Sequence, residues 1–153
     1  MGARPSPDLT CEIDLFAAQI SAQVRAARLH KLVIADKTIA NVLAYCQVAM
    51  PAPSAEEHAV ISAMNRFCRA WAASYDAIIL CQDRYEQHLE SKTYTKPLFA
   101  YQAAVAERLE SVLAEIDRPT IRLPLGLTTT ERLSVTIDGL EHLGISSHIL
   151  AND

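Results

Sequence analysis

The segment from Ala55 to about Glu90 most constrains what this chain can fold into, because it contains neither glycine nor proline and predicts one unbroken helix. Upstream, Pro51 and Pro53 end whatever precedes it, since proline cannot continue a helical hydrogen-bond pattern. Ser54 and Glu57 have the spacing of a capping box, in which each side chain accepts from the other residue's backbone N–H. The sequence therefore predicts a helix that begins at Ala55.

Apolar residues recur along this segment at intervals of three, four and seven, which is typical of a helix buried along one face. They are Val60, Met64, Phe67, Trp71, Tyr75, Ile78, Tyr85 and Leu89. Between Trp71 and Cys81 the segment is apolar nearly all round, and a helix of that kind is covered by others on most sides. We therefore expect it to form the centre of the fold.

Other helices are predicted on both sides of this segment. One runs from about Leu9 to Arg28, and a second ends near Met50. A fourth is capped by Thr95, carries Pro97 in its first turn and is ended by Pro119. Connections between these helices are short, which favours helices packed beside one another.

The C-terminal third is less regular. Apolar residues alternate through 118–127, which predicts an extended linker, although Pro124 and Gly126 make it a poor central strand. Thr128 and Glu131 then form a second capping box, which favours a helix over 128–145. The alternative is a hairpin that turns at residues 138–139, an Asp-Gly pair.

Together these patterns predict an all-α protein, a four- to five-helix bundle or orthogonal helical array around one long central helix, with an extended segment near 120–127. We expect a single helical domain over residues 1–153. It has an N-terminal arm at 1–8, the linker at 118–127, and the helix at 128–145.

The charge and the cysteine content limit the partners and the cellular location that we expect. Residues 101–153 carry eight acidic and four basic side chains, and no basic run occurs, so nucleic acid is not an expected partner. The four cysteines, Cys11, Cys46, Cys68 and Cys81, show no C-x-x-C spacing and are expected to be reduced thiols of a cytoplasmic protein. The longest charge-free stretch contains Asn41, Gln47 and two prolines, so no membrane span is expected.

Motifs of catalysis and cofactor binding are also absent from the sequence. The four glycines, Gly2, Gly126, Gly139 and Gly144, are too scattered for a phosphate-binding loop. No acidic residue stands three positions before a histidine, as a di-iron bundle requires, and H-E-x-x-H does not occur. The sequence therefore predicts no catalytic, cofactor-binding or metal-binding residue.

Asp76 is the candidate buried polar residue, because it lies inside the most apolar part of the predicted central helix. A buried carboxylate must be paired or have a raised pKa. Asp76 is expected either to occupy a narrow polar edge, to pair with an arginine such as Arg25, Arg28 or Arg108, or to act as a ligand or proton-handling group.

These observations favour a non-catalytic subunit that binds a protein partner or a second copy of itself through apolar helix faces and terminal arms. The candidate interface residues are Tyr94, Ile121, Leu123, Leu125 and Leu127. The alternative is a small-molecule sensor or small enzyme with a pocket inside the bundle. That pocket would use Trp71, Tyr75, Asp76 and Cys81.

Overall fold

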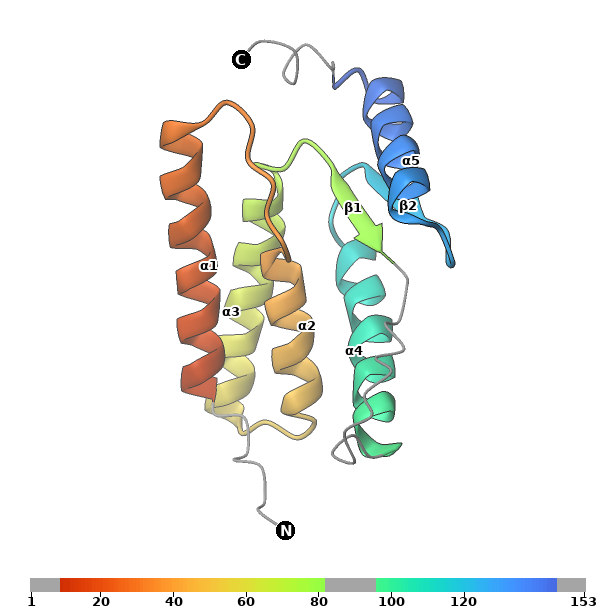
Figure 1. Ribbon diagram of the computed structural model, residues 1–153. Helices are drawn as coiled ribbons and strands as arrows, with labels where there is room; N and C mark the ends of the chain where they lie inside the picture. Colours follow the sequence, from red (N-terminus) through yellow and green to blue (C-terminus); the bar gives the residue numbers. More distant parts are fainter. Residues whose placement is uncertain (1–8, 82–95, 146–153) are drawn as a thin grey trace. The chain divides into compact units, whose positions relative to one another are not determined.

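The computed structural model describes residues 9–81 and 96–145, and it is mainly helical with a small two-stranded parallel sheet (Figure 1). Its elements in chain order are α1 (Leu9–Leu29), α2 (Ile39–Ala49), α3 (Ala55–Ala72), β1 (Ile78–Cys81), α4 (Lys96–Ala114), β2 (Thr120–Leu123) and α5 (Thr129–His142). The mainly helical prediction is confirmed. The parallel pair of strands is an addition that an all-α class does not contain.

The predicted continuous helix from Ala55 to Glu90 is wrong beyond Ala72, and residues 82–90 of that prediction lie outside the described residues. The helix begins as expected, with the Glu57 N–H donating to Ser54 Oγ at 3.3 Å and the Ser54 N–H donating to Glu57 Oε2 at 2.8 Å. It ends at Ala72, whose carbonyl accepts from the Tyr75 N–H at 3.0 Å in a turn. The chain then enters β1 at Ile78. A short apolar run such as Ile78–Cys81 suits a buried strand as well as a buried helix, so periodicity alone does not separate the two.

Contacts gather the chain into two compact units. Unit 1 comprises residues 1–71 and 95–116, with α1, α2, α4 and all of α3 except its last residue. Unit 2 comprises residues 72–94 and 117–153, with β1, β2 and α5.

The core of unit 1 is built on α2, which contacts both α1 and α4. Ile39, Leu43 and Cys46 of this helix are fully buried, together with Cys68 of α3. Residues Ile39–Ala49 include no charged side chain, so α2 can be covered on all sides without burying a charge. The central helix of unit 1 is thus α2, and the expectation that the Ala55 helix is the centrepiece is wrong.

One face of α3 is buried and the opposite face is polar. Its buried side chains, Ile61, Met64 and Cys68, follow one another at spacings of three and four residues. The predicted stripe residues Val60 and Phe67 lie at the border of that face and are partly exposed. Figure 1 shows α1, α2 and α3 side by side.

Unit 2 contains the sheet. β1 and β2 run parallel, with Ile78 opposite Thr120 and Cys81 opposite Leu123. The Ile78 N–H donates to the Pro119 carbonyl at 2.9 Å, just before β2. Parallel strands need a long crossover connection, and here it runs through α4. Part of the predicted extended linker is therefore a paired strand.

Helix α5 contacts β2 and takes the place of the alternative hairpin. Its capping box is formed as predicted, with the Glu131 N–H donating to Thr128 Oγ1 at 3.3 Å and the Thr128 N–H donating to Glu131 Oε2 at 2.8 Å. Gly139 lies within the helix, where a Cβ atom would come within 2.9 Å of Ile121 Cδ1. The glycine is thus explained by the close approach of α5 to β2 rather than by a turn.

Candidate functional site

The structure describes four of the five predicted interface residues, and their surroundings differ. Leu123 of β2 is buried, and Ile121 of β2 packs against α5 at Gly139. Leu127 is half-buried and its carbonyl accepts from Arg132 Nε at 3.0 Å. Leu125 is 67% exposed, and Tyr94 lies outside the described residues. Of this set, Leu125 is the described residue whose side chain is free to meet a partner.

Asp76 is not inside a helix. It lies in an exposed bend between α3 and β1. The prediction that it is buried is wrong, because it assumed that the helix continues past Ala72. No ion pair joins it to Arg25, Arg28 or Arg108, among the residues that the structure describes.

The side chains proposed for a pocket inside the bundle have other surroundings. Trp71 donates from Nε1 to Gln23 Oε1 of α1 at 2.9 Å, and its ring stacks on Phe67 at 5.8 Å between centroids. Cys81 is exposed at the end of β1. Trp71 therefore joins α3 to α1 within unit 1.

The outer edge of β1 is the first candidate site, and it is formed by backbone groups. Along a parallel strand, alternate residues turn their N–H and C=O toward opposite neighbours. Because the Ile78 N–H bonds to Pro119 next to β2, the N–H and C=O of Ile79 and Cys81 point away from β2. The side chains of Ile79 and Cys81 are exposed as well. In the part of the chain that the structure describes, no third strand pairs with this edge.

β1 and β2 differ in how their edges are protected. β2 has Pro119 before it, Pro124 after it and the exposed Arg122 within it, and prolines and charged side chains are what native proteins use to block edge-to-edge pairing. β1 reads Ile-Ile-Leu-Cys, with no charge and no proline. Such continuous apolar runs are typical of strands that are covered on both faces of the sheet.

The rest of unit 2 also leaves apolar surface uncovered. None of the residues of α5 is buried, and its apolar side chain Leu133 is 59% exposed. Ile79, Leu125 and Leu143 are exposed in the same unit. The described part of unit 2 therefore leaves several large apolar side chains exposed.

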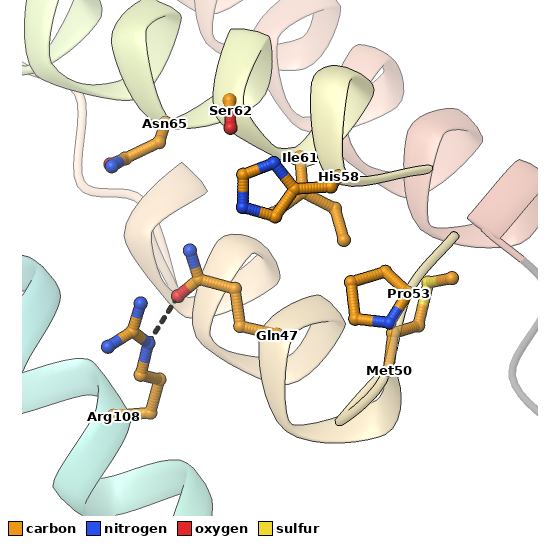
Figure 2. A pocket seen from close by; sticks show the side chains of 8 residues that line it. All are labelled: Gln47, Met50, Pro53, His58, Ile61, Ser62, Asn65 and Arg108. Atoms are coloured by element: carbon orange, nitrogen blue, oxygen red, sulfur yellow. Dashed lines mark hydrogen bonds between the residues drawn. The ribbon is translucent and has the colours of Figure 1, made fainter. Parts of the chain in front are cut away.

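The second candidate site is a pocket of about 320 Å³ in unit 1, between α2, α3 and α4 (Figure 2). It is lined by Gln47, Met50, Pro53, His58, Ile61, Ser62, Asn65 and Arg108. Arg108 Nε donates to Gln47 Oε1, as the dashed line in Figure 2 marks. Sequence reasoning missed this pocket, although His58, Ser62 and Asn65 recur on α3 at spacings of four and three, which places them on one helix face.

The buried thiols have perturbed acidity. Burial raises the pKa of Cys46 to about 11, with the negative charge of Glu12 adding to the effect. Burial also raises the pKa of Cys68 to about 11, where Arg69 lowers it and Glu115 raises it further. Both groups therefore stay protonated thiols at neutral pH and are poor nucleophiles.

Residues 9–81 and 96–145 bring no three His, Cys, Asp or Glu side chains together in a way that could hold a metal ion. The helices of these two ranges include none with the length and apolar character needed to cross a membrane. No family model, curated protein or solved structure matches the chain.

Proposed function

We propose that the protein is a non-catalytic interaction subunit that pairs with a second copy of itself through the outer edge of β1. The observation that carries this proposal is the difference between the two strands: β2 has prolines and a charge at its edge, and β1 has neither. An unprotected edge with free N–H and C=O groups recruits another extended strand.

The second copy is the favoured occupant because β1 is complementary to itself. Two uncharged apolar strands can pair antiparallel across a two-fold axis, which is the commonest symmetry of oligomers. The sheet order would then be β2-β1-β1-β2. Each protected strand, with its Pro119 and Pro124, would end at an outer edge, where such residues are tolerated.

Energetics also support pairing. A lone two-stranded unit is marginal in water, and a packed helix or further strands with an apolar face are needed; here α5 supplies the helix and the association would add strands. Joining two copies would give four strands and would bring the exposed Ile79 side chain next to apolar neighbours. The association would therefore cover the open backbone edge of β1 and part of the exposed Ile79 side chain.

Two further sequence predictions belong to this proposal. A helical bundle in unit 1 is supported by the contacts of α2 with α1 and α4. A cytoplasmic location is supported by free thiols at Cys46 and Cys68, since a reducing compartment keeps cysteines unpaired.

Sedimentation equilibrium over a wide concentration range tests the pairing. The wild-type chain should shift from monomer to dimer, and Ile79→Pro should remain monomeric because it removes an N–H that points away from β2. Ile79→Lys should weaken the dimer too, since a charged side chain opposes edge pairing. Val60→Lys is the matched control: Val60 is 36% exposed on α3, against 40% for Ile79, and its substitution should leave the dimer intact.

A wild-type chain that stays monomeric at every concentration would contradict the proposal. So would a dimer that both Ile79 variants leave unchanged. Far-UV circular dichroism of each variant shows whether the fold is retained.

A further inference from the structure

Arg108 on α4 is a half-buried cation with a neutral partner. Its Nε donates to the amide oxygen of Gln47, and it forms no ion pair with any residue that the structure describes. The neighbouring ion pair joins Arg69 to Glu115, so that carboxylate is already balanced by another arginine. A guanidinium withdrawn from water without a counter-ion is costly, and its remaining N–H groups form a fork that matches a carboxylate or a phosphate.

Polar side chains on α3 face the same pocket. Ser62 and Asn65 are half-buried and offer a hydroxyl and an amide, while His58 is exposed. One N–H of Asn65 donates to Glu115 Oε2 at 3.4 Å, which fixes the amide in place. The eight lining residues include one arginine and no aspartate or glutamate, so the pocket wall itself does not repel an anion.

The pocket is divided into a polar end and an apolar end. Figure 2 shows Arg108, Gln47 and Asn65 on one side and Met50 and Pro53 on the other. Ile61, which is buried, also lines the pocket. A ligand that fits this arrangement has an anionic head and a short apolar body.

We propose that this pocket binds a small amphipathic anion, a carboxylate or a phosphate monoester, with its head on the free N–H groups of Arg108 and its apolar body against Met50 and Pro53. The site lies wholly in unit 1 and uses no residue of β1. It is therefore independent of the proposed strand pairing. A pocket of about 320 Å³ is at the lower end of the range for small-molecule sites.

NMR titration of the full chain with three probes tests this site: sodium hexanoate, n-butyl phosphate and the uncharged 1-hexanol. The anions should shift the amide signals of Gln47, Ser62 and Arg108 saturably at millimolar concentration. Hexanol should bind at least about tenfold more weakly than the anions, because it lacks the charge that Arg108 recognises. The ratio of the two anion affinities distinguishes a carboxylate site from a phosphate site.

The variant Arg108→Gln should weaken anion binding about tenfold and leave hexanol binding unchanged. Arg66→Gln is the matched control, since it removes the same charge from an exposed position of α3 outside the pocket. Arg108→Lys keeps the charge but loses the fork, so it should bind anions with intermediate affinity and serves if the glutamine variant fails to fold.

Either of two results would overturn the site. One is the absence of saturable shifts with both anions, and the other is an equal loss of affinity in the Arg66 and Arg108 variants.

Discussion

Units 1 and 2 bury their apolar residues to very different extents. In unit 1, α2 contributes the fully buried Ile39, Leu43 and Cys46, with other helices around them. In the described part of unit 2, α5 has no buried residue and the sheet has two strands. Unit 1 thus has a core of its own, whereas unit 2 has the parts of an α/β layer with one unprotected edge.

This difference indicates where stability and where association arise. A filled core loses free energy when any of its atoms is removed. A surface that is half covered tolerates substitution in the isolated chain and becomes sensitive when a second chain covers it. The following variants compare how strongly substitutions in each unit change the stability of the folded chain.

The largest effect is expected from Leu43→Ala in α2. Leu43 is fully buried in the folded chain, so its truncation leaves a cavity. The truncation should lower the free energy of unfolding by about 3 kcal/mol. Leu133→Ala in α5 is the matched control, and because Leu133 is 59% exposed, its cost should be below about 1 kcal/mol. Urea denaturation measures both. Equal costs would contradict the contrast between the units.

Thiol labelling compares buried with exposed cysteines. Cys11 and Cys81 are exposed and should react quickly with a thiol reagent, whereas Cys46 and Cys68 are buried. Raising a thiol pKa from 9.0 to about 11 lowers the thiolate fraction about a hundredfold at neutral pH.

The same pKa shifts make the stability of the folded chain depend on pH in the alkaline range. Since the folded pKa lies above the unfolded value, the contribution of these thiols to stability is complete below pH 9 and is lost as the pH rises toward 11. Mass spectrometry after timed labelling should find two fast and two slow sites. Fast labelling of all four in the folded chain would show that the core of unit 1 is open.

Gly139→Ala tests the contact between α5 and β2. The added Cβ would come within 2.9 Å of Ile121 Cδ1 and 3.0 Å of Ile121 Cγ2, and Ile121 is β-branched with little freedom to turn away. We expect a net cost of about 1 kcal/mol, because overpacking outweighs the helix propensity gained. In an Ile121→Ala background the same change should cost nothing, which a double-mutant cycle by thermal denaturation measures. Additive costs would show that the two residues are not in contact.

The smallest effect is expected at the cap of α5. Hydrogen bonds from the side chain and backbone of Thr128 hold the pKa of Glu131 below its usual value. Thr128→Ala should therefore raise the pKa of Glu131, as followed by NMR of its carboxyl carbon, and Thr129→Ala should leave it unchanged.

The sign of the pH dependence follows from that direction. Because the folded pKa is lower than the unfolded one, the stabilisation is present above the unfolded pKa and is lost as the pH falls through the folded pKa. An unchanged titration of Glu131 in Thr128→Ala would mean that the capping box does not form in solution.

Local signals in the sequence were sufficient for the helix ends and insufficient for the sheet. The capping boxes at Ser54 and Thr128 are formed by residues three apart, so they can be read directly from the chain. β1 depends on its pairing with β2, about forty residues later, and nothing near Ile78 specifies that partner. The run from Trp71 to Cys81 therefore predicts a helix when the sequence is taken alone, although its apolar content fits a strand equally well.

Neither candidate site could be predicted from the sequence, because each depends on contacts between segments that are far apart in the chain. The pocket combines residues of α2, α3 and α4, and only the polar face of α3, with His58 and Ser62, is visible as a pattern in one helix. The buried position of α2 had a signal that could have been used, because Ile39–Ala49 has no charged residue. The open edge of β1 becomes apparent only when the direction of the Ile78 N–H is known.

Amide hydrogen exchange of Ile79, measured as a function of protein concentration, tests the pairing of two β1 strands most directly. The Ile79 N–H points away from β2, so its exchange should slow as the concentration rises through dimer formation, while the Ile78 N–H, bonded to Pro119, should show little change. An Ile79 amide that exchanges at the same rate at all concentrations would contradict the pairing.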